Sequence, residues 1–321
     1  MEFSNLTGCP AQFQVGSTGD LEMVGMAACK ATWRIDGGRL VPVGEMERWP
    51  VFDKPHAIGG LAFNAELDHR KQGTDLLVLG RIRTPLGRPA TQQEVGLRCG
   101  QLALRTLAFG DRHWDKSWGK LKMTPPQRFV EPPLANELAF GGTALFEGQA
   151  LAHAVNPHGR GFYATKEGAE GQPLPNLERP EQLIRGWEDR PVPACWYRPQ
   201  GPMELAMGGD PAAMPGRVAM GMFNQAVPDL VASSGQLGDK ILLTGFSAEG
   251  PCELPMPPQA GPAGRGQVGE FRSLIPSRLS TVVLMPDSRV VVATYLCVFR
   301  YLMKPREART MELVWPGGGH A

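Results

Sequence analysis

The sequence predicts a mainly β fold of antiparallel sheets, arranged like a sandwich or a barrel, with long ordered Gly/Pro-rich loops and one or two short helices. Turn-forming residues are frequent, since 40 glycines and 30 prolines among 321 residues disfavour long helices. Several segments alternate apolar and polar residues with a period of two, the pattern of a half-buried strand. Gly, Pro and Asp stand between these segments, where an all-β fold needs its turns.

The first part of the chain, residues 1–124, carries the clearest strand patterns. Residues 29–35 (CKATWRI) alternate, so that Cys, Ala, Trp and Ile face one way while Lys, Thr and Arg face the other. Residues 36–38 (DGG) follow between apolar stretches and predict a hairpin. Residues 75–82 (DLLVLGRI) form an apolar run, which predicts a strand covered on both faces, and residues 95–109 alternate again. We therefore expect this part to be rich in strands.

The middle of the chain, residues 125–235, is dense in Pro and Gly and shows little periodicity. Because a structureless loop of this length is unusual in a compact domain, we expect short strands and ordered loops laid over the flanking sheets. One short helix is predicted at residues 179–189 (RPEQLIRGWED), where a proline stands near the first helical position and three apolar residues share a face.

The last part, residues 236–321, again favours strands. Residues 241–246 (ILLTGF) are a short apolar run, and residues 280–302 contain two β-rich runs around a Pro-Asp-Ser turn, which predicts a hairpin. Between them, residues 255–269 (PMPPQAGPAGRGQVG) are the strongest candidate for a flexible segment. We therefore predict a single domain over residues 1–321, divided into these three parts.

The charge balance of the chain disfavours nucleic acids and membranes as partners. Lys and Arg number 33, Asp and Glu number 32, and no dense basic run attracts phosphate backbones or anionic lipids. The longest apolar run, residues 290–299, is about half a membrane span. The N-terminal residues lack the basic and apolar regions of a signal peptide. Six scattered cysteines show neither a C-x-x-C motif nor zinc-ligand spacing, so we expect a cytoplasmic protein with reduced thiols.

Cofactor and metal sites are not expected. A phosphate-binding loop of the type G-x-x-x-x-G-K-[ST] is absent from the sequence. The glycines of residues 159–162 (GRGF) precede no amphipathic helix, which a dinucleotide-binding fingerprint requires. No H-E-x-x-H motif and no His-x-His cluster suggests a metal ion.

Residues 109–115 (FGDRHWD) bring two acids, an arginine and a histidine together in the sequence. Asp111 and His113 are two positions apart, so in a strand they share a face, and such a pair can orient a general base. The nucleophile motif G-x-S-x-G is absent. A hydrolase that uses Asp111 and Glu137, with His113 as a further group, stays open as an alternative. The favoured interpretation is structural, with Arg112 paired with a carboxylate, because ion-pair networks also collect such residues.

Two glycine-rich motifs, residues 136–142 (NELAFGG) and 156–162 (NPHGRGF), are interpreted as one structural corner. The Asn-Pro pair begins a tight turn, and the glycines adopt backbone conformations that other residues avoid. A buried arginine needs a carboxylate partner, and Glu137 and Asp111 are the expected partners of Arg160. The residues assigned to this structural motif are Asp111, Arg112, Glu137, Gly141, Gly142, Asn156, Gly159, Arg160 and Gly161.

Residues 201–225 (GPMELAMGGDPAAMPGRVAMGMFNQ) are rich in methionine. Methionine fills cores by default, but at this density beside Gly and Pro it also makes a deformable apolar surface for varied partners. Both interpretations stay open, and the core is the default. The candidate partner-binding residues are Met203, Met207, Met214, Met220, Met222 and Phe223.

Seven motifs follow one another along the chain. They are residues 74–80 (TDLLVLG), 109–114 (FGDRHW), 137–142 (ELAFGG), 156–162 (NPHGRGF), 174–180 (LPNLERP), 222–230 (MFNQAVPDL) and 281–287 (TVVLMPD). In this order the set resembles a bacterial family of unknown function that is encoded beside type VI secretion genes, next to genes for VgrG spike, PAAR tip and toxin proteins. The resemblance covers nearly the whole chain.

The resemblance implies a non-enzymatic adaptor or chaperone that binds a toxin effector and helps to load it on the VgrG or PAAR spike protein. The chain departs from the family pattern at Leu138, where the family usually has Arg, and at residues 227–230 (VPDL), which replace a PPDQ-like element. The first departure removes one partner of Glu137 and leaves Arg160 or Arg112. A structural component of a phage-tail-like particle is a third hypothesis.

Overall fold

The computed structural model describes residues 1–321 except 18–21, 59–60, 199–222, 303–308 and 316–321. Within the described residues the fold is mainly β, as predicted, with one sheet of ten strands, one of five and four of two. No helix in this part is long and apolar enough to cross a membrane. The described helical turns are η1 (Glu45–Glu47), η2 (Pro85–Gly87), η3 (Asn136–Leu138), α1 (Lys166–Ala169) and η6 (Pro228–Leu230).

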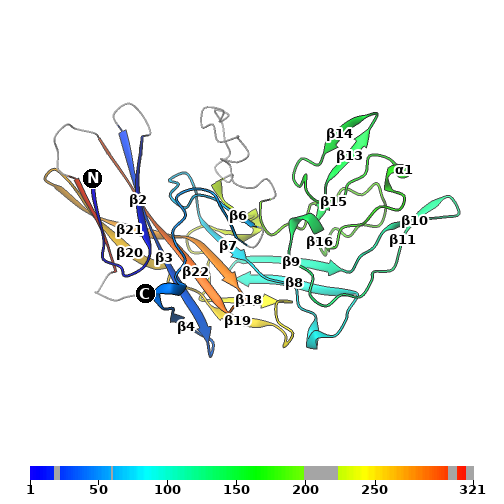
Figure 1. Ribbon diagram of the computed structural model, residues 1–321, viewed down its shortest axis with the longest axis horizontal. Coiled ribbons are helices and arrows are strands. Elements are labelled where there is room, and N and C mark those ends of the chain that lie inside the picture. The colour runs from blue at the N-terminus through cyan, green and yellow to red at the C-terminus, as the bar shows by residue number, and fades with distance from the viewer. Residues whose placement is uncertain (18–21, 59–60, 199–222, 303–308, 316–321) are drawn as a thin grey trace.

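The ten-stranded sheet combines long strands from both ends of the chain (Figure 1). Its order is β1-β23-β20-β21-β22-β3-β2, with β4 paired to β3, β7 to β21 and β17 to β7. The pairs β1–β23 and β21–β7 are parallel, whereas the others are antiparallel. The strands are β1 (Glu2–Asn5), β2 (Ala11–Ser17), β3 (Glu22–Asp36), β4 (Arg39–Pro42), β7 (Thr74–Val78), β17 (Val231–Ala232), β20 (Ala260–Val268), β21 (Phe271–Met285), β22 (Val290–Leu302) and β23 (Arg309–Val314).

This sheet is nearly closed, like a barrel. The strands β1 and β2 lie at its two edges but follow each other in the chain. The ring of Phe3 in β1 stacks on the ring of Phe13 in β2 with centroids 5.5 Å apart, and Phe13 in turn stacks on Phe299 of β22. The two edges therefore approach each other through side chains, and this covers edges that an open sheet would leave free to pair with another chain.

The hairpins and the apolar strand were predicted correctly. The β3–β4 hairpin turns at Gly37 and Gly38, whose φ angles of 54° and 75° suit glycine. The β21–β22 hairpin pairs Met285 with Val290 around the Pro-Asp-Ser turn. All five residues of β7 are buried, as expected for a strand covered on both faces.

The strand β3 is more buried than its alternating sequence indicates. Its apolar face packs in the core as predicted, but Lys30 and Thr32 on the other face are only 1% and 6% exposed. The reason is a covering segment between β4 and β7, from which Glu66 forms a 2.6 Å ion pair with Lys30 and Trp49 donates its backbone N–H to Thr32. The prediction of a half-buried strand was wrong here because its polar side chains find polar partners inside the protein.

The predicted flexible segment, residues 255–269, is largely the strand β20. Its glycines allow close packing: a Cβ atom on Gly261 would overlap the ring of Tyr295, and one on Gly264 would overlap the side chain of Met311. Glycine within a strand marks such close approaches, so the composition of this segment reflects packing rather than flexibility.

The five-stranded sheet has the order β16-β9-β8-β18-β19. Its alternating side chains enter a core that continues into the ten-stranded sheet, for example through Leu104 and Leu77. The buried indole of Trp196 packs against Phe246 and donates to the hydroxyl of Thr106. The strands are β8 (Gln92–Cys99), β9 (Leu102–Phe109), β16 (Leu177–Glu178), β18 (Lys240–Thr244) and β19 (Cys252–Pro255).

The short strands β10, β11 and β13–β15 and the helix α1 form a lobe at one end of the long axis, whereas the N-terminus lies at the other end (Figure 1). The lobe has a small core of its own, made of Trp114, Phe140, Ala169, Leu174 and Ile184. The remaining short strands are β5 (His56–Ile58), β6 (Leu61–Phe63), β10 (Trp114–Ser117), β11 (Lys120–Met123), β12 (Phe140–Gly141), β13 (Thr143–Phe146), β14 (Gln149–Ala152) and β15 (Arg160–Gly161).

The helix predicted at residues 179–189 is wrong, because this segment is an irregular loop. Side-chain carboxylates accept hydrogen bonds from backbone N–H groups that would donate to backbone carbonyls in a helix. The carboxylate of Glu178 accepts from the N–H of Ile184, and that of Asp189 accepts from the N–H groups of Arg185 and Gly186. Local side-chain acceptors thus replace the helical pattern.

Candidate functional site

A first cleft of about 600 Å³ lies between the end of β7, the β21–β22 turn and the loops of the middle part. Its lining includes residues from four of the seven sequence motifs. The lining includes Leu79, Arg81, Glu137, His158, Arg198 and Asp287. Segments far apart in the sequence therefore converge on one hollow, which the sequence order alone does not reveal.

A second cleft of about 460 Å³ lies beside the first and shares Arg198 with it. Two further motifs contribute to its lining, through Arg179 and through residues 227–229. Several apolar side chains, among them Val155, Val192 and Val227, line it. Burial raises the pKa of the Cys195 thiol, which also lines this cleft, to about 12, so this thiol stays protonated and is a poor nucleophile.

The charged groups at the rims of the clefts are largely paired. Arg179 forms a 2.7 Å ion pair with Asp229 at the second cleft. At the first cleft, Asp287 forms a 3.0 Å ion pair with Arg83. The carboxylate of Asp287 also accepts the backbone N–H of Arg81 at 3.1 Å. These contacts fix the β21–β22 turn against the end of β7.

Arg198 differs from these groups. Its Nη1 atom is buried and has no hydrogen-bond partner among the described residues. Burial lowers the pKa of the Arg198 guanidinium, and the charge of Asp75 offsets part of this effect. The backbone positions it firmly, since the N–H of Arg198 donates to Gln225 and the neighbouring Tyr197 hydroxyl donates to the carbonyl of Val78.

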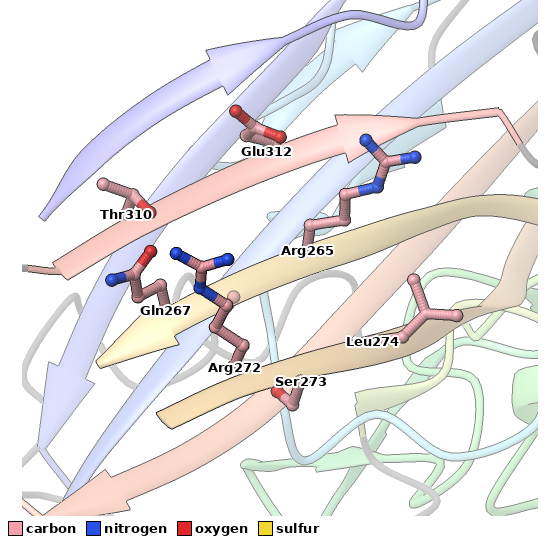
Figure 2. Close-up of a pocket in the computed structure, with 8 residues that line it drawn as sticks. Arg265, Gln267, Arg272, Ser273, Leu274, Thr310 and Glu312 are labelled. Atoms are coloured by element: carbon pink, nitrogen blue, oxygen red, sulfur yellow. The ribbon is translucent and has the colours of Figure 1, made fainter. Parts of the chain in front are cut away.

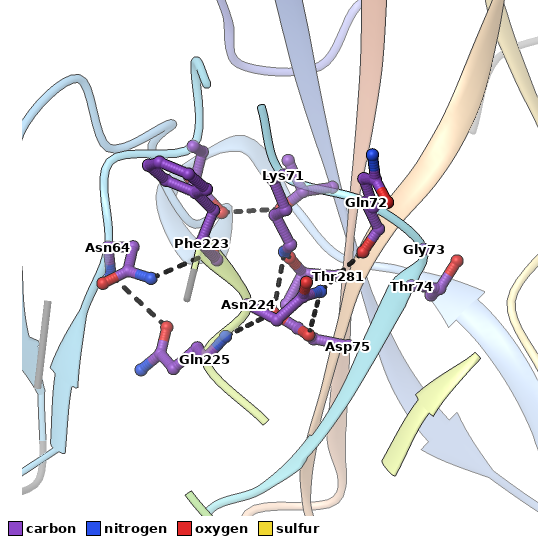
Figure 3. A network of polar contacts seen from close by, with 12 residues as sticks. Asn64, Lys71, Gln72, Gly73, Thr74, Asp75, Phe223, Asn224, Gln225 and Thr281 are labelled. Atoms are coloured by element: carbon purple, nitrogen blue, oxygen red, sulfur yellow. Dashed lines mark hydrogen bonds and ion pairs between the residues drawn. The ribbon is translucent and has the colours of Figure 1, made fainter. Parts of the chain in front are cut away.

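A buried polar network anchors the chain that follows residue 222 (Figure 3). The carboxylate of Asp75 is fully buried and accepts from the ammonium group of Lys71 at 2.9 Å. It also accepts from the side-chain amide of Asn224 at 2.8 Å and from the backbone N–H of Gln225 at 2.9 Å. The motifs TDLLVLG and MFNQAVPDL therefore meet here, and we call this network the Asp75 clasp.

Phe223 belongs to the same region. Its ring is buried, with the guanidinium of Arg70 4.2 Å from the ring centroid, and its carbonyl accepts from Asn64. The ring is thus not exposed to a partner, in contrast to the proposed role of Phe223 in partner binding. The other candidates, Met203, Met207, Met214, Met220 and Met222, lie outside the described residues.

The structure brings the two glycine-rich motifs together as a corner. The strands β12 and β15 pair in parallel, and the buried Asn156 donates its amide to the carbonyls of Asn136 and Phe140. A Cβ atom on Gly159 would lie 2.6 Å from the carbonyl oxygen of Ala139. Gly141, Gly142 and Gly161 have positive φ angles and the same lack of space. Glycine is required at this corner, as the sequence predicted.

The partners predicted for Arg160 were wrong. Its Nη1 donates to Asn176 at 3.0 Å, and its Nε donates to the backbone carbonyl of Glu137, not to the carboxylate. The amide of Asn176 also donates to Asp111 at 2.9 Å, so it lies between Arg160 and the expected acid. Because Arg160 is only partly buried, water and amide oxygens suffice and no ion pair is needed.

The buried ion pair of this lobe is instead Arg112 with Glu178, at 2.5 Å. The prediction named Arg112 with an unspecified carboxylate, and it missed Glu178. The only feature of the sequence that could have indicated a buried Glu178 is its position in the motif LPNLERP, directly after an apolar residue.

The candidate hydrolase groups are held by separate partners. Asp111 and His113 are exposed and alternate with the buried Arg112 and Trp114, but they precede the strand β10 and do not lie in a strand. Asp111 accepts from Asn176, whereas the ring of His113 contacts the hydroxyl of Thr124. Glu137 lines the first cleft.

A shallow hollow on the outer face of β20, β21 and β23 carries Arg265, Arg272 and Glu312 (Figure 2). None of the seven motifs contributes to its lining. This hollow shares no lining residue with the two clefts, so its residues are suitable positions for control variants.

The corner is expected to lose stability in mild acid through His153. The ring packs edge-on against Phe140 and Phe162, and its Nδ1 accepts the backbone N–H of Asn156 at 3.1 Å. Burial, with a smaller contribution from Arg190, lowers the pKa of His153 below its ordinary value of 6.5. The unfolded chain therefore takes up this proton first, and stability present above 6.5 is lost as the pH falls towards the folded pKa.

Thermal melts between about pH 7.5 and about pH 5.5, a range that spans the ordinary histidine pKa, measure this effect. The melting temperature of the wild type should fall more over this range than that of His153→Gln, which keeps an acceptor but does not titrate. His113→Gln, at an exposed histidine, serves as the control and should follow the wild type. Equal pH dependence in all three proteins contradicts the assignment to His153.

Comparison with known proteins gives one match. A family model described as "Uncharacterized protein conserved in bacteria (DUF2169)" matches residues 21–295. No curated protein and no solved structure matches the chain. The residues that line the two clefts all fall within the matched range, whereas Thr310 and Glu312 of the outer hollow fall beyond it.

Proposed function

We propose that this chain, which belongs to the bacterial DUF2169 family, is a non-enzymatic adaptor or chaperone of type VI secretion. In this proposal it binds a toxin effector in the cytoplasm and helps to load the effector on the VgrG or PAAR spike protein. The proposal starts from the order of the seven motifs, which resembles proteins encoded beside type VI secretion genes.

The observation that carries the proposal is the convergence of six motifs on two adjoining clefts. Their lining combines apolar side chains with ionic groups, several of which are already paired, as at a surface that receives another polypeptide. Binding surfaces are commonly built on loops that a rigid scaffold positions, and here the two large sheets form that scaffold.

The direct test is association with the products of neighbouring genes. We expect the purified chain to form a stoichiometric complex with the neighbouring toxin protein, measured by gel filtration and calorimetry. VgrG and PAAR proteins are tested separately. Permanent incorporation into the secretion particle would favour a structural component instead. Hydrolytic turnover that is lost in Asp111→Asn would favour an enzyme.

The second cleft should be sensitive to an added charge. Val192 is 51% exposed within it, so Val192→Glu should leave the fold intact, with a stability change below about 0.5 kcal/mol, typical of surface sites. Covering the exposed half of this valine contributes about half of the roughly 1.5–3 kcal/mol for a whole side chain, and a carboxylate buried there without a partner opposes binding further, so toxin affinity should fall about tenfold or more. Calorimetric titration of the toxin measures this.

Leu145→Glu is the matched control, because Leu145 is 75% exposed on β13 and lines neither cleft. It should bind the toxin like the wild type. If the two variants lose the same affinity, the second cleft is not the binding site.

A further inference from the structure

The position of Arg198 between the two clefts indicates a binding role. Its side chain lines both hollows, and its Nη1 atom is buried without a partner among the described residues. Buried polar groups in proteins are nearly always hydrogen-bonded, because leaving one unpaired is unfavourable. An unpaired buried donor at the meeting point of two clefts therefore needs a reason other than folding.

Arg179 also has a buried atom without a partner among the described residues, its Nε, but the guanidinium groups of the neighbouring arginines, unlike that of Arg198, form ion pairs with carboxylates. Arg179 has the carboxylate of Asp229 as a partner, and Arg83 has that of Asp287. The nearby Asp75 acts on Arg198 only through its charge, since its oxygens accept from the clasp residues. The guanidinium group is a planar fork of donors that matches a carboxylate, which is the acceptor missing at this place.

We propose that Arg198 binds an aspartate or glutamate side chain of a partner polypeptide, next to an apolar residue of the partner that enters the second cleft. This inference rests on the proposed function in that the partner is the toxin effector. It adds that the effector must present an acidic side chain next to an apolar one.

The layout of the clefts favours a side chain over a chain end. Arg198 lines both clefts, so a polypeptide that passes over its guanidinium can contact the lining of one cleft before Arg198 and the lining of the other after it. On one side Val155, Val192 and Val227 offer an apolar wall. On the other side Arg81 and Glu137 offer groups of both signs. A terminal carboxylate would leave one of the two hollows empty.

A displayed library of random peptides, each flanked by linker sequence so that no free carboxyl end is present, tests the chemistry without a known effector. Selection on the wild-type chain should enrich sequences with Asp or Glu beside Val, Leu or Ile. Synthetic peptides from this selection, blocked at both ends, should lose about tenfold or more in affinity when the acid is changed to its amide. The same loss is expected in Arg198→Gln with the original peptide.

Three controls keep the result specific. Arg265→Gln removes an exposed arginine of the outer hollow and should bind the peptides like the wild type. Arg198→Lys keeps the charge without the fork and should bind with intermediate affinity. The melting temperature of Arg198→Gln should change little, because the buried Nη1 atom has no hydrogen-bond partner to lose among the described residues. If Arg198→Gln does not fold, the Lys variant and the acid-to-amide peptides decide the question.

The proposal is overturned if no selected peptide depends on its acidic residue, or if binding requires a free terminal carboxylate. Toxin that binds the wild type and Arg198→Gln equally also overturns it, while the adaptor function stands. Conversely, acidic peptides that depend on Arg198, with no complex with any neighbouring gene product, would support the site and contradict the adaptor function.

Discussion

Asp75→Asn is expected to lower the free energy of unfolding by about 3–5 kcal/mol, the usual cost of removing one partner from a buried ion pair. The carboxylate is fully buried and accepts from Lys71, Asn224 and Gln225. An amide of the same shape carries no charge and has only one accepting atom. The ammonium group of Lys71 then keeps the hydroxyl of Thr281 as its partner but loses its counter-charge. Denaturant titration measures the change.

Glu253→Gln is the control, because the Lys240–Glu253 pair is more than half exposed on both sides and solvent screens it, so its loss should change the stability little. If Asp75→Asn is too unstable to purify, Lys71→Met with Asp75→Asn removes both charges. The double variant should then be recovered in folded form, because it leaves no unpaired charge buried in the clasp. A loss no larger than that of Glu253→Gln would show that the clasp does not depend on the charge of Asp75.

Local sequence signals were sufficient where neighbouring residues determine the structure. The Gly37-Gly38 turn and the Pro-Asp-Ser turn fix their hairpins within a few residues, and the apolar run of β7 requires burial wherever it lies. The errors have a common origin in distant contacts. Tyr295 and Met311 explain the glycines of β20, and Glu66 explains why Lys30 is buried. Sequence order does not show these contacts.

The site was only partly predictable for the same reason. Six of the seven motifs contribute residues to the two clefts, and the glycine corner followed from backbone conformation alone. Arg198 was missed because it belongs to no motif and stands directly after a buried run, residues 193–197. An arginine that ends a fully buried aromatic segment is a signal that could have drawn attention to it, since such a charge must lie near the core.

Glu178→Gln should have the second large effect, again about 3–5 kcal/mol of lost stability. Glu178 is 3% exposed and Arg112 is 8% exposed, and their ion pair measures 2.5 Å. The second carboxylate oxygen accepts the N–H of Ile184, so the same residue also holds the loop that replaces the predicted helix. Glutamine can keep that bond but leaves the guanidinium of Arg112 without a counter-charge.

Arg160→Ala is the comparison variant. It tests whether the Arg112–Glu178 ion pair stabilises the protein more than Arg160, which the sequence predicted to form the buried ion pair of the glycine-rich corner. Arg160 is partly buried and donates to an amide oxygen and a carbonyl, so its loss should cost about 1–3 kcal/mol, the range for hydrogen bonds to charged groups and unsatisfied acceptors. Thermal and denaturant unfolding of the two variants should therefore rank Glu178→Gln as the less stable. If Arg160→Ala is instead the less stable variant, the interactions of Arg160 stabilise the fold more than the Arg112–Glu178 ion pair does. This result would also show that Arg112 finds enough compensation in the carbonyl of Pro175 and the ring of Phe109, whose centroid is 4.0 Å from its guanidinium carbon.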